Sequence, residues 1–365
     1  MLKKKLRKIN KDVKIKFFFK FYPKIKNIVS ANTIKDIKIK KVKFKNFPPY
    51  NVYEIKDTRI YTDKLYDVAI IKNNNLLDGP SFQLRNNDLA KTKKNEVLKF
   101  GTPYFKKNLK GTTVSFLTGG FGNENYWHWL FDVLPKFALL ERTVNLEKID
   151  HFLLPNITKK FQRETLDILN IRNKKRLSSF YNRHLSCEKL IVIDHPRLKK
   201  SPTFNRFDDA PRWSSNWLRK KFLKKIKPNK KLPKKFYIDR KDSENKNRII
   251  LNESKLVSIL KRKKFKIINL SKLSFSHQIA LFNNANTILG LHGAGFSNLV
   301  FCKPKAKIIE IRPKNFKTSN VIKNLSKHNN LNLKYHSLDC KTISKTSRVQ
   351  DGIIEVPLEK LNNLI

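Results

Sequence analysis

The second half of the chain alternates short apolar runs with amphipathic segments, and this rhythm constrains the fold more than any other feature. Runs of strand length lie at Phe236–Ile238, Phe265–Leu270, Thr287–Leu291, Lys307–Ile311 and Leu333–Leu338. Between them lie segments with helical spacing of apolar residues, two of which begin at the capping residues Asn252 and Ser274. Strands that alternate with helices form parallel sheets covered by helices. The sequence therefore predicts an α/β fold.

The first half shows the same alternation less regularly. We expect strands at Tyr66–Ile71, Thr112–Leu117, His151–Leu154 and Lys189–Ile193. Helices are expected from about Asn125, over Lys160–Leu169, and from a cap at Ser214 to about Ile226. Two Rossmann-like domains with parallel sheets facing across a cleft are the expected architecture, with the ligand at the carboxyl ends of the strands.

Composition shifts divide the chain further. A basic leader over 1–45 precedes the first Rossmann-like domain at 46–226. The lysine-rich segment 227–235, which holds Pro228 and Pro233, is the expected linker. The second domain is expected over 236–340, followed by a tail at 341–365 that packs back on the fold.

The net charge of +51 has two explanations. It could mark a partner rich in phosphate, such as a nucleic acid or an acidic membrane. It could also reflect drift under A/T-rich codon usage, because lysine far outnumbers arginine, the residue favoured for phosphate geometry. We favour drift, and we expect no nucleic-acid partner.

The stretch Lys14–Tyr22 mixes lysines with five aromatic residues. It could lie on an anionic membrane surface, or it could be a solvated leader with a few core anchors. No apolar run approaches the roughly 20 residues that span a bilayer, and three cysteines form no disulfide framework. We therefore expect a cytoplasmic protein, peripheral at most on the inner face of the plasma membrane.

The segment Thr287–Phe301 reads TILGLHGAGFSNLVF, an apolar strand that runs through His292-Gly293-Ala294-Gly295 into a helix. Glycines let the backbone approach a ligand closely, and a helix start suits a phosphate. The alternative is a strand-to-helix turn whose glycines serve packing. The pattern matches neither a P-loop nor the Gly-x-Gly-x-x-Gly dinucleotide turn.

Three charged residues are expected at the same sheet edge. Arg240 follows a strand and Arg248 lies in the same loop, and arginine forks suit a diphosphate. Either could instead be a solvated surface group. Glu310 could accept hydrogen bonds from ribose hydroxyls, or it could form an ion pair with Arg312.

The segment Gly119–Glu141 places a glycine-rich loop before an aromatic helix. His128 and Asp132 are four residues apart and share a helix face. Such a pair can take a proton from a hydroxyl group, or it can simply be a packed histidine held by its carboxylate. Trp127 and Trp129 could stack on a sugar or fill the core. Because the chain has no Asp-x-Asp or other metal motif, we expect no metal and no cofactor.

These pieces together resemble glycosyltransferase family 61. The three matching stretches are Asn125-Tyr126-Trp127-His128-Trp129 with Asp132 and Pro135; Arg240 with Arg248, Ile250, Asn252 and Glu253; and LHGAGFSNLVF with Pro304 and IIEIRP. They follow one another in the expected order over about residues 112–315. Asp239 departs from the pattern, since a small hydroxyl residue is expected before Arg240.

The resemblance implies a GT-B-like, inverting, metal-independent transferase similar to bacterial members that act in surface polysaccharide synthesis. Its substrates would be a nucleotide sugar, UDP-linked in our expectation, and a glycan or lipid-linked acceptor. The expected catalytic residues are His128 and Asp132, and the acceptor side is expected at Asn125, Trp127 and Trp129. Expected donor-binding residues are Arg240, Arg248, His292, Gly293, Ala294, Gly295, Ser297, Asn298 and Glu310. A basic nucleic-acid-binding protein and a non-catalytic sugar-nucleotide-binding relative are the alternatives.

Overall fold

The computed structural model describes residues 12–62, 67–85, 88–90, 92–120, 124–197, 210–225, 231–240, 248–314, 320–328, 332–344 and 352–365. The chain forms two compact units, Met1–Arg206 and Phe207–Ile365.

Helix α6 (Arg212–Phe222) groups with the second unit, although the sequence analysis placed it in the first region. Arg219 on this helix donates to the backbone carbonyls of Val300 and Cys302 at 2.6 and 2.9 Å. The expected cap at Ser214 is wrong, because the helix starts earlier, after Pro211, and the Ser214 hydroxyl donates to the Pro211 carbonyl. Residues 227–230 of the expected linker lie outside the described residues.

The first unit holds a mixed sheet rather than the expected parallel one. Strand β11 pairs in parallel with β8, and β8 with β9, whereas β3 pairs antiparallel with β2, β4 and β11. The described strands are β1 (Ile28–Ser30), β2 (Ile37–Val42), β3 (Tyr50–Tyr61), β4 (Asp67–Lys72), β5 (Asn75–Asp78), β6 (Phe82–Arg85), β7 (Asp88–Ala90), β8 (Lys107–Ser115), β9 (His151–Leu154), β10 (Arg176–Ser178) and β11 (His184–Ile193).

Among β2, β3, β4 and β5 the antiparallel pairing follows from short connections that leave no room for a crossover helix. Strands β4 and β5 are joined through Asn73 and Asn74, both with positive φ, of 49° and 57°. Asparagine tolerates this conformation, which suits the tight turn of a hairpin. The first half therefore follows the expected strand–helix alternation only from β8 onward.

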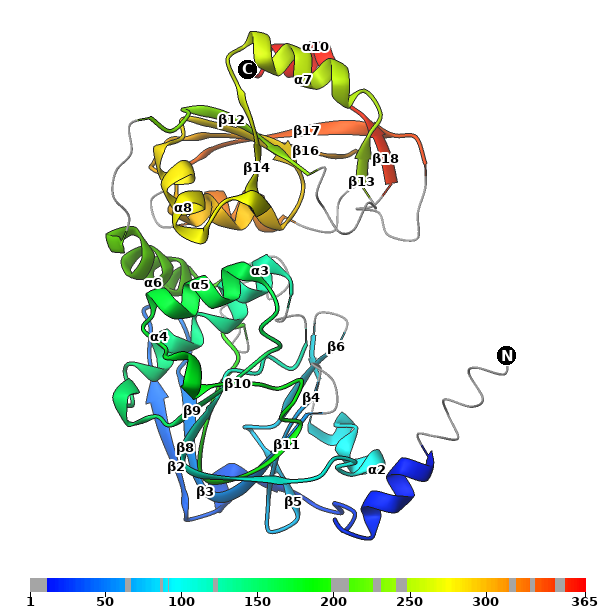
Figure 1. The fold of residues 1–365 in the computed structure, drawn as a ribbon, viewed down its shortest axis with the longest axis vertical. Coiled ribbons are helices and arrows are strands. Elements are labelled where there is room, and N and C mark those ends of the chain that lie inside the picture. Colours follow the sequence, from blue (N-terminus) through cyan, green and yellow to red (C-terminus); the bar gives the residue numbers. More distant parts are fainter. Residues whose placement is uncertain are drawn as a thin grey trace. The chain divides into compact units, whose positions relative to one another are not determined.

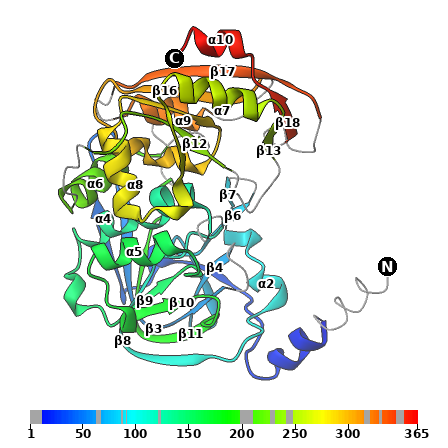
Figure 2. The ribbon, with the colours of Figure 1, turned by 45° about the horizontal axis from the view of Figure 1, so that its top comes forward.

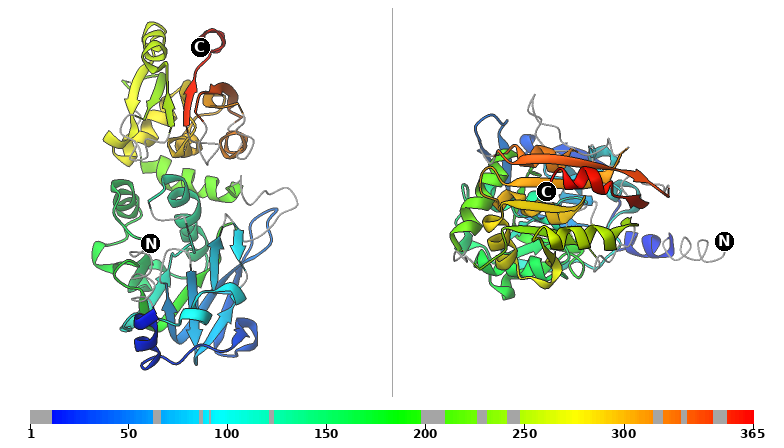
Figure 3. Two further views of the ribbon diagram at one scale, coloured as in Figure 1. Left: turned by 90° about the vertical axis from the view of Figure 1, so that its right-hand side faces the viewer. Right: turned by 90° about the horizontal axis from the view of Figure 1, so that it is seen from above.

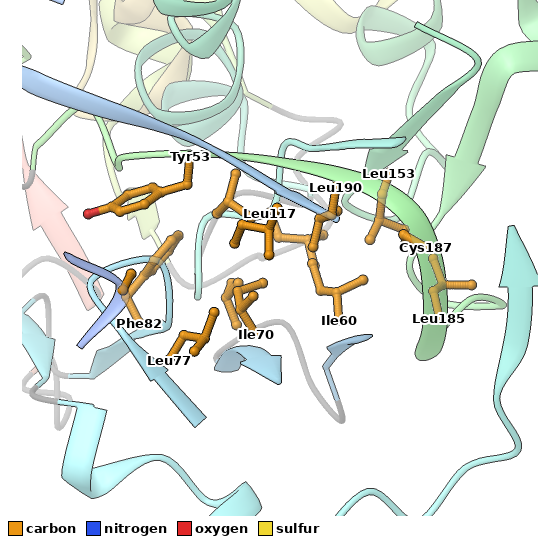
Figure 4. Close-up of a cluster of buried hydrophobic side chains, with 14 of the residues drawn as sticks. Tyr53, Ile60, Ile70, Leu77, Phe82, Leu117, Leu153, Leu185, Cys187 and Leu190 are labelled. Carbon is orange, nitrogen blue, oxygen red and sulfur yellow. The ribbon is translucent and has the colours of Figure 1, made fainter. Parts of the chain in front are cut away.

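The core of the first unit is formed mainly by side chains from the strands of this sheet. Figure 4 shows side chains such as Ile60, Ile70 and Leu190 converging on one another, and each is at most 1% exposed. This unit includes the helices α2 (Val97–Phe100), α3 (Tyr126–His128), α4 (Lys136–Leu140) and α5 (Lys160–Ile168). The expected helix over Lys160–Leu169 is thus confirmed.

The expected leader contributes to this unit. Strands β1 and β2 join its sheet through β5 and β3. Residues 12–19 form a helix, drawn in dark blue in Figure 2. Its side chains Ile15 and Phe18 are buried.

The second unit holds a sheet of seven described strands in the order β13-β18-β17-β16-β15-β12-β14. All neighbours pair in parallel except β17 and β18. The strands are β12 (Lys235–Asp239), β13 (Arg248–Ile250), β14 (Lys266–Asn269), β15 (Thr287–Leu291), β16 (Lys307–Pro313), β17 (Lys334–Thr342) and β18 (Gly352–Glu355). After β12 the chain forms β13 at the far edge beside β18, then β14 on one side of β12, and then β15 on the other side of β12. This order makes the edge between β12 and β15 a topological switch point.

Helices cover both faces of this sheet, as expected of an α/β unit. Helices α7 (Glu253–Arg262) and α10 (Leu358–Asn362) lie on one face, and α8 (Phe275–Asn284) lies on the other (Figures 1 and 3). Helix α9 (Val321–Ser326) connects β16 to β17. Leu256 and Leu361 pack with Tyr237 on the first face, whereas the ring of Phe282 lies 5.2 Å from that of Phe236 on the second.

The two helix caps expected in this unit differ in outcome. Ser274 accepts a hydrogen bond from the His277 amide, so this cap is confirmed. Asn252 precedes α7 but its side chain instead pairs with the backbone of Val356, at 2.8 and 3.0 Å. Among the described residues, no helix combines the length and the apolar character needed to cross a bilayer.

Candidate active site

Two arginines contact one backbone carbonyl at the carboxyl end of β15: Arg240, which follows β12, and Arg248, the first residue of β13. Arg240 directly follows β12, and His292 directly follows β15, the neighbouring strand. The His292 carbonyl accepts hydrogen bonds from Nη1 of Arg240 at 2.7 Å and from Nη1 of Arg248 at 2.6 Å. Both arginines are partly exposed. The structure thus brings together the two arginines and the glycine turn that the sequence singled out.

Gly293 leaves room for the Arg240 guanidinium, and its backbone conformation does not call for a glycine. Its φ of 168° is extended backbone that any residue adopts. A Cβ at this position would lie 2.5 Å from Nη1 of Arg240, so the guanidinium would have to move away from the turn. The same test at Gly295 places the Cβ 3.0 Å from the Leu270 side chain. Gly293 therefore leaves space for the two arginine side chains, and Gly295 lets the turn pack closely against Leu270 and Ile238.

The segment after the glycine turn is a 3-10 helix, Ala294–Phe301 (η8), rather than the expected α-helix. Ser297 and Asn298 on this helix are fully buried. The Asn298 amide donates to Oε1 of Gln278 at 2.9 Å, which ties η8 to α8. The Ser297 hydroxyl has no hydrogen-bond partner among the described residues. Both side chains are buried in the unit, and Asn298 holds the turn against α8.

Glu310 on β16 lies buried between two hydrogen-bond donors. Its Oε1 contacts Nδ1 of His292, and its Oε2 accepts a hydrogen bond from the Tyr335 hydroxyl. Burial and the Glu310 charge raise the pKa of Tyr335, which keeps that phenol a donor. Arg312 pairs instead with Asp339, at 3.0 Å, so the expected alternative of an ion pair with Glu310 is not what the structure shows. Glu310 orients the His292 side chain at the turn.

In the first unit, the aromatic motif forms the short helix α3 and the helical turn that follows it. The Asn125 side chain caps α3 by accepting hydrogen bonds from the amides of Trp127 and His128. Residues Trp129–Val133 continue as a π-helix, which is the widened turn often found at functional sites. Trp129 is fully buried and donates to Oγ1 of Thr165 at 2.9 Å. Trp129 thus fills the core, whereas Trp127 stays partly exposed.

His128 and Asp132 meet as expected, and Arg197 joins them. Nδ1 of His128 lies 2.6 Å from Oδ2 of Asp132. Arg197 binds both carboxylate oxygens, with Nε at 2.8 Å from Oδ1 and Nη2 at 2.7 Å from Oδ2. The side chains of Asp132 and Arg197 are 1% and 6% exposed, and that of His128 is 15% exposed. Only the imidazole therefore reaches solvent to any extent.

The surroundings fix the charge of this carboxylate. Burial alone would raise the pKa of Asp132, but the Arg197 guanidinium and His128 outweigh it and hold that pKa far below its usual range. Asp132 therefore stays ionised and is a weak base. With Nδ1 of His128 donating to Oδ2 of Asp132, Nε2 is the ring nitrogen that carries the basic lone pair.

Two further buried bases lie in this cluster. His195 accepts the Arg197 amide hydrogen at Nδ1, and its Nε2 has no hydrogen-bond partner among the described residues. Burial lowers the pKa of His195 to about 3. Lys136 donates to the Leu117 carbonyl, and burial lowers its pKa to about 7, opposed by Asp194 and Asp132.

The sequence analysis missed Lys136, His195 and Arg197. Lys136 extends the spacing of His128 and Asp132 by a further four residues. His195 and Arg197 lie just beyond the end of β11, the carboxyl edge of the parallel part of the sheet. A signal for them existed, because Asp194-His195-Pro196-Arg197 follows the apolar strand directly.

No group of three or more His, Cys, Asp or Glu side chains within the described ranges could hold a metal ion.

Comparison with models of known protein families identifies a match. The family model described as Glycosyltransferase 61 matches residues 126–309, half of the chain. The match begins at the aromatic helix of His128 and ends one residue before Glu310. No curated protein matches the chain.

Proposed function

Because the chain belongs to glycosyltransferase family 61 and is thereby a glycosyltransferase, we propose that it is an inverting, metal-independent enzyme that uses a nucleotide sugar. The acceptor is the hydroxyl group of a glycan or a lipid-linked sugar, and the product enters a surface polysaccharide. A GT-B arrangement, with the donor on the second unit and the acceptor on the first, is part of this proposal.

One observation carries the proposal: two guanidinium groups meet on the His292 carbonyl at the switch point between β12 and β15. Ligands of doubly wound sheets bind at such an edge. A diphosphate offers each guanidinium an anionic partner in a geometry that suits the arginine fork. Because Gly293 has no side chain, the Arg240 guanidinium has room to lie at this position.

Fixed positive groups at this edge would assist the leaving group. When the bond between the anomeric carbon and the diphosphate breaks, negative charge develops on the departing oxygen. Arg240 and Arg248 stabilise that charge because they are already oriented before the reaction. This is the role that a divalent cation has in metal-dependent transferases.

His128 is the proposed base. As the acceptor oxygen attacks the anomeric carbon, its proton passes to Nε2 of His128, and the nucleoside diphosphate leaves from the opposite face. Asp132 orients the imidazole and stabilises its protonated form, and Arg197 holds Asp132 ionised. Asp132 itself is a poor base because Arg197 binds both its oxygens.

The donor site can be tested without knowing the acceptor. We expect one nucleoside diphosphate to raise the melting temperature and to bind with one site per chain, since a ligand specific to the folded state stabilises it. Arg240→Ala should weaken this binding by roughly tenfold to a hundredfold, which corresponds to about 1.5–3 kcal/mol for a charge-assisted hydrogen bond.

Arg262→Ala is the matched control, because Arg262 is exposed on α7 of the same unit. It should leave the affinity unchanged. If calorimetry gives equal affinities for both variants and the wild type, the phosphate assignment is wrong.

A further inference from the structure

Large apolar side chains are exposed together on the first unit. Three segments contribute them: residues 12–26, 104–107 and 180–183. The exposed side chains are Val13 (62%), Phe17 (46%), Phe21 (54%), Phe105 (63%), Phe180 (51%) and Tyr181 (72%). We call this surface the aromatic patch.

Direct contacts join the three segments. The ring of Phe105 lies 6.3 Å from that of Phe17 and 6.0 Å from that of Phe21. Lys107, two residues beyond Phe105, donates to the Tyr181 carbonyl at 3.0 Å. The six side chains therefore belong to one region of the unit.

The patch is held by the fold. Ile15, Phe18 and Ile25 from the first segment are buried. The Lys106 amide donates to the Tyr22 hydroxyl at 2.9 Å, and the Lys14 ammonium lies 3.6 Å from the centre of the Tyr104 ring. One face of the segment 12–26 is thus used for packing, while Val13, Phe17 and Phe21, spaced four residues apart, remain outward.

The same three segments are strongly basic. They carry eight lysines and arginines and one acidic residue, Asp12. Lys16, Lys20, Lys24 and Lys26 are all exposed. Aromatic side chains among lysines are what an interfacial membrane site needs, because the rings enter the boundary of the acyl chains and the lysines meet the phosphates.

We propose that the aromatic patch docks the enzyme on a membrane surface that contains anionic lipid. Lysines alone would suit any polyanion, including a nucleic acid. Burying exposed aliphatic and phenyl groups out of water lowers the free energy, and the interface of a lipid bilayer offers such an apolar environment. This docking does not depend on the proposed donor site, and it would place the enzyme where a lipid-linked acceptor lies.

Vesicle sedimentation of the full chain tests the proposal. We expect binding to phosphatidylcholine vesicles that contain phosphatidylglycerol, weaker binding at high salt, and little binding to phosphatidylcholine alone. Phe17→Ser combined with Phe21→Ser should lower the partition coefficient at least tenfold. Lys16→Gln and Lys20→Gln should each lower it roughly fivefold, since a basic residue near such a surface contributes about 1 kcal/mol.

Leu251→Ser combined with Ile343→Ser is the matched control, because these side chains are 60% and 46% exposed on the second unit. It should bind vesicles like the wild type. Phe21→Trp keeps an apolar ring in the aromatic patch and adds a fluorescent indole there. Brominated lipids in the vesicles should quench the fluorescence of this indole.

Three outcomes overturn the proposal. The first is equal binding to neutral and anionic vesicles, and the second is no binding to either. The third is binding to anionic vesicles that is unaffected by the Phe17→Ser and Phe21→Ser pair and matched by binding to a DNA fragment. That last result would identify a polyanion surface instead.

Discussion

Replacing Arg197 with methionine should destabilise the first unit strongly. Arg197 binds both oxygens of Asp132, at 2.8 and 2.7 Å, and the carboxylate is 1% exposed. Methionine keeps most of the side-chain volume but leaves a buried charge without its cation. Breaking a buried ion pair in this way costs about 3–5 kcal/mol.

The free energy of unfolding in urea measures this loss. Arg312→Met is the matched control, because its partner Asp339 has a side chain that is 43% exposed. An exposed pair contributes about 0–1 kcal/mol, so this variant should unfold near the wild-type midpoint. Arg197→Lys should fall between the two, since it keeps the charge and loses the fork.

The loss should also depend on pH in a defined direction. In the wild type, the pKa of Asp132 is depressed, so its contribution to stability is present above the ordinary carboxyl pKa of about 3.9 and is lost as the pH falls further. Without Arg197 that contribution disappears. The difference between wild type and Arg197→Met should therefore be largest near neutral pH and shrink below pH ~4. A loss below about 1 kcal/mol at neutral pH, equal to that of Arg312→Met, would refute the buried network described above.

Three further predictions follow from the structure. Gly293→Val should weaken nucleoside diphosphate binding at least tenfold, because the new Cβ would lie 2.5 Å from Nη1 of Arg240; unchanged affinity by calorimetry contradicts this. Sugar transfer should continue in excess chelator, and loss of transfer that manganese restores would show a metal requirement. Burial lowers the pKa values of His184 and His328 to about 4, so the unfolded chain takes up protons first and stability should fall as the pH drops from about 6.5 toward 4. Each histidine contributes up to about 3 kcal/mol to this fall; urea midpoints that stay constant over this range would contradict it.

The second unit was predictable because its signals are local. Apolar runs of strand length correspond to β12, β14, β15, β16 and β17. The cap at Ser274 depends on an amide three residues away, so sequence alone was sufficient to find it. The cap at Asn252 failed because its side chain pairs with Val356, which is 104 residues away in the sequence.

The first unit was harder because its strands pair over long distances. The pairing of β3 with β11 joins residues such as Val52 and Ile193. No local pattern in the sequence of β3 indicates that β11 is its partner. The hairpin at Asn73 and Asn74 was a readable local signal, and it already argues against a crossover helix at that point.

In the candidate site, too, local spacing reveals some residues and only the fold reveals others. His128 and Asp132 share a helical spacing and were found. Arg197 lies 65 residues from Asp132, and only the fold reveals that the two form an ion pair. Trp129 could not be assigned from the sequence, because a buried indole and a sugar-stacking indole look the same there; its bond to Thr165 decides.

Transfer of a labelled sugar tests the central claim most directly. The full chain would be incubated in chelator with a panel of labelled nucleotide sugars and a glycan or lipid-linked acceptor extract, beside His128→Ala on the same preparations. The account predicts that one donor passes its sugar to the acceptor with inversion of the anomeric configuration. It also predicts that His128→Ala slows transfer roughly 10²–10⁴-fold while donor affinity and melting temperature stay near wild type. Transfer with retention, or full activity in His128→Ala, would contradict it.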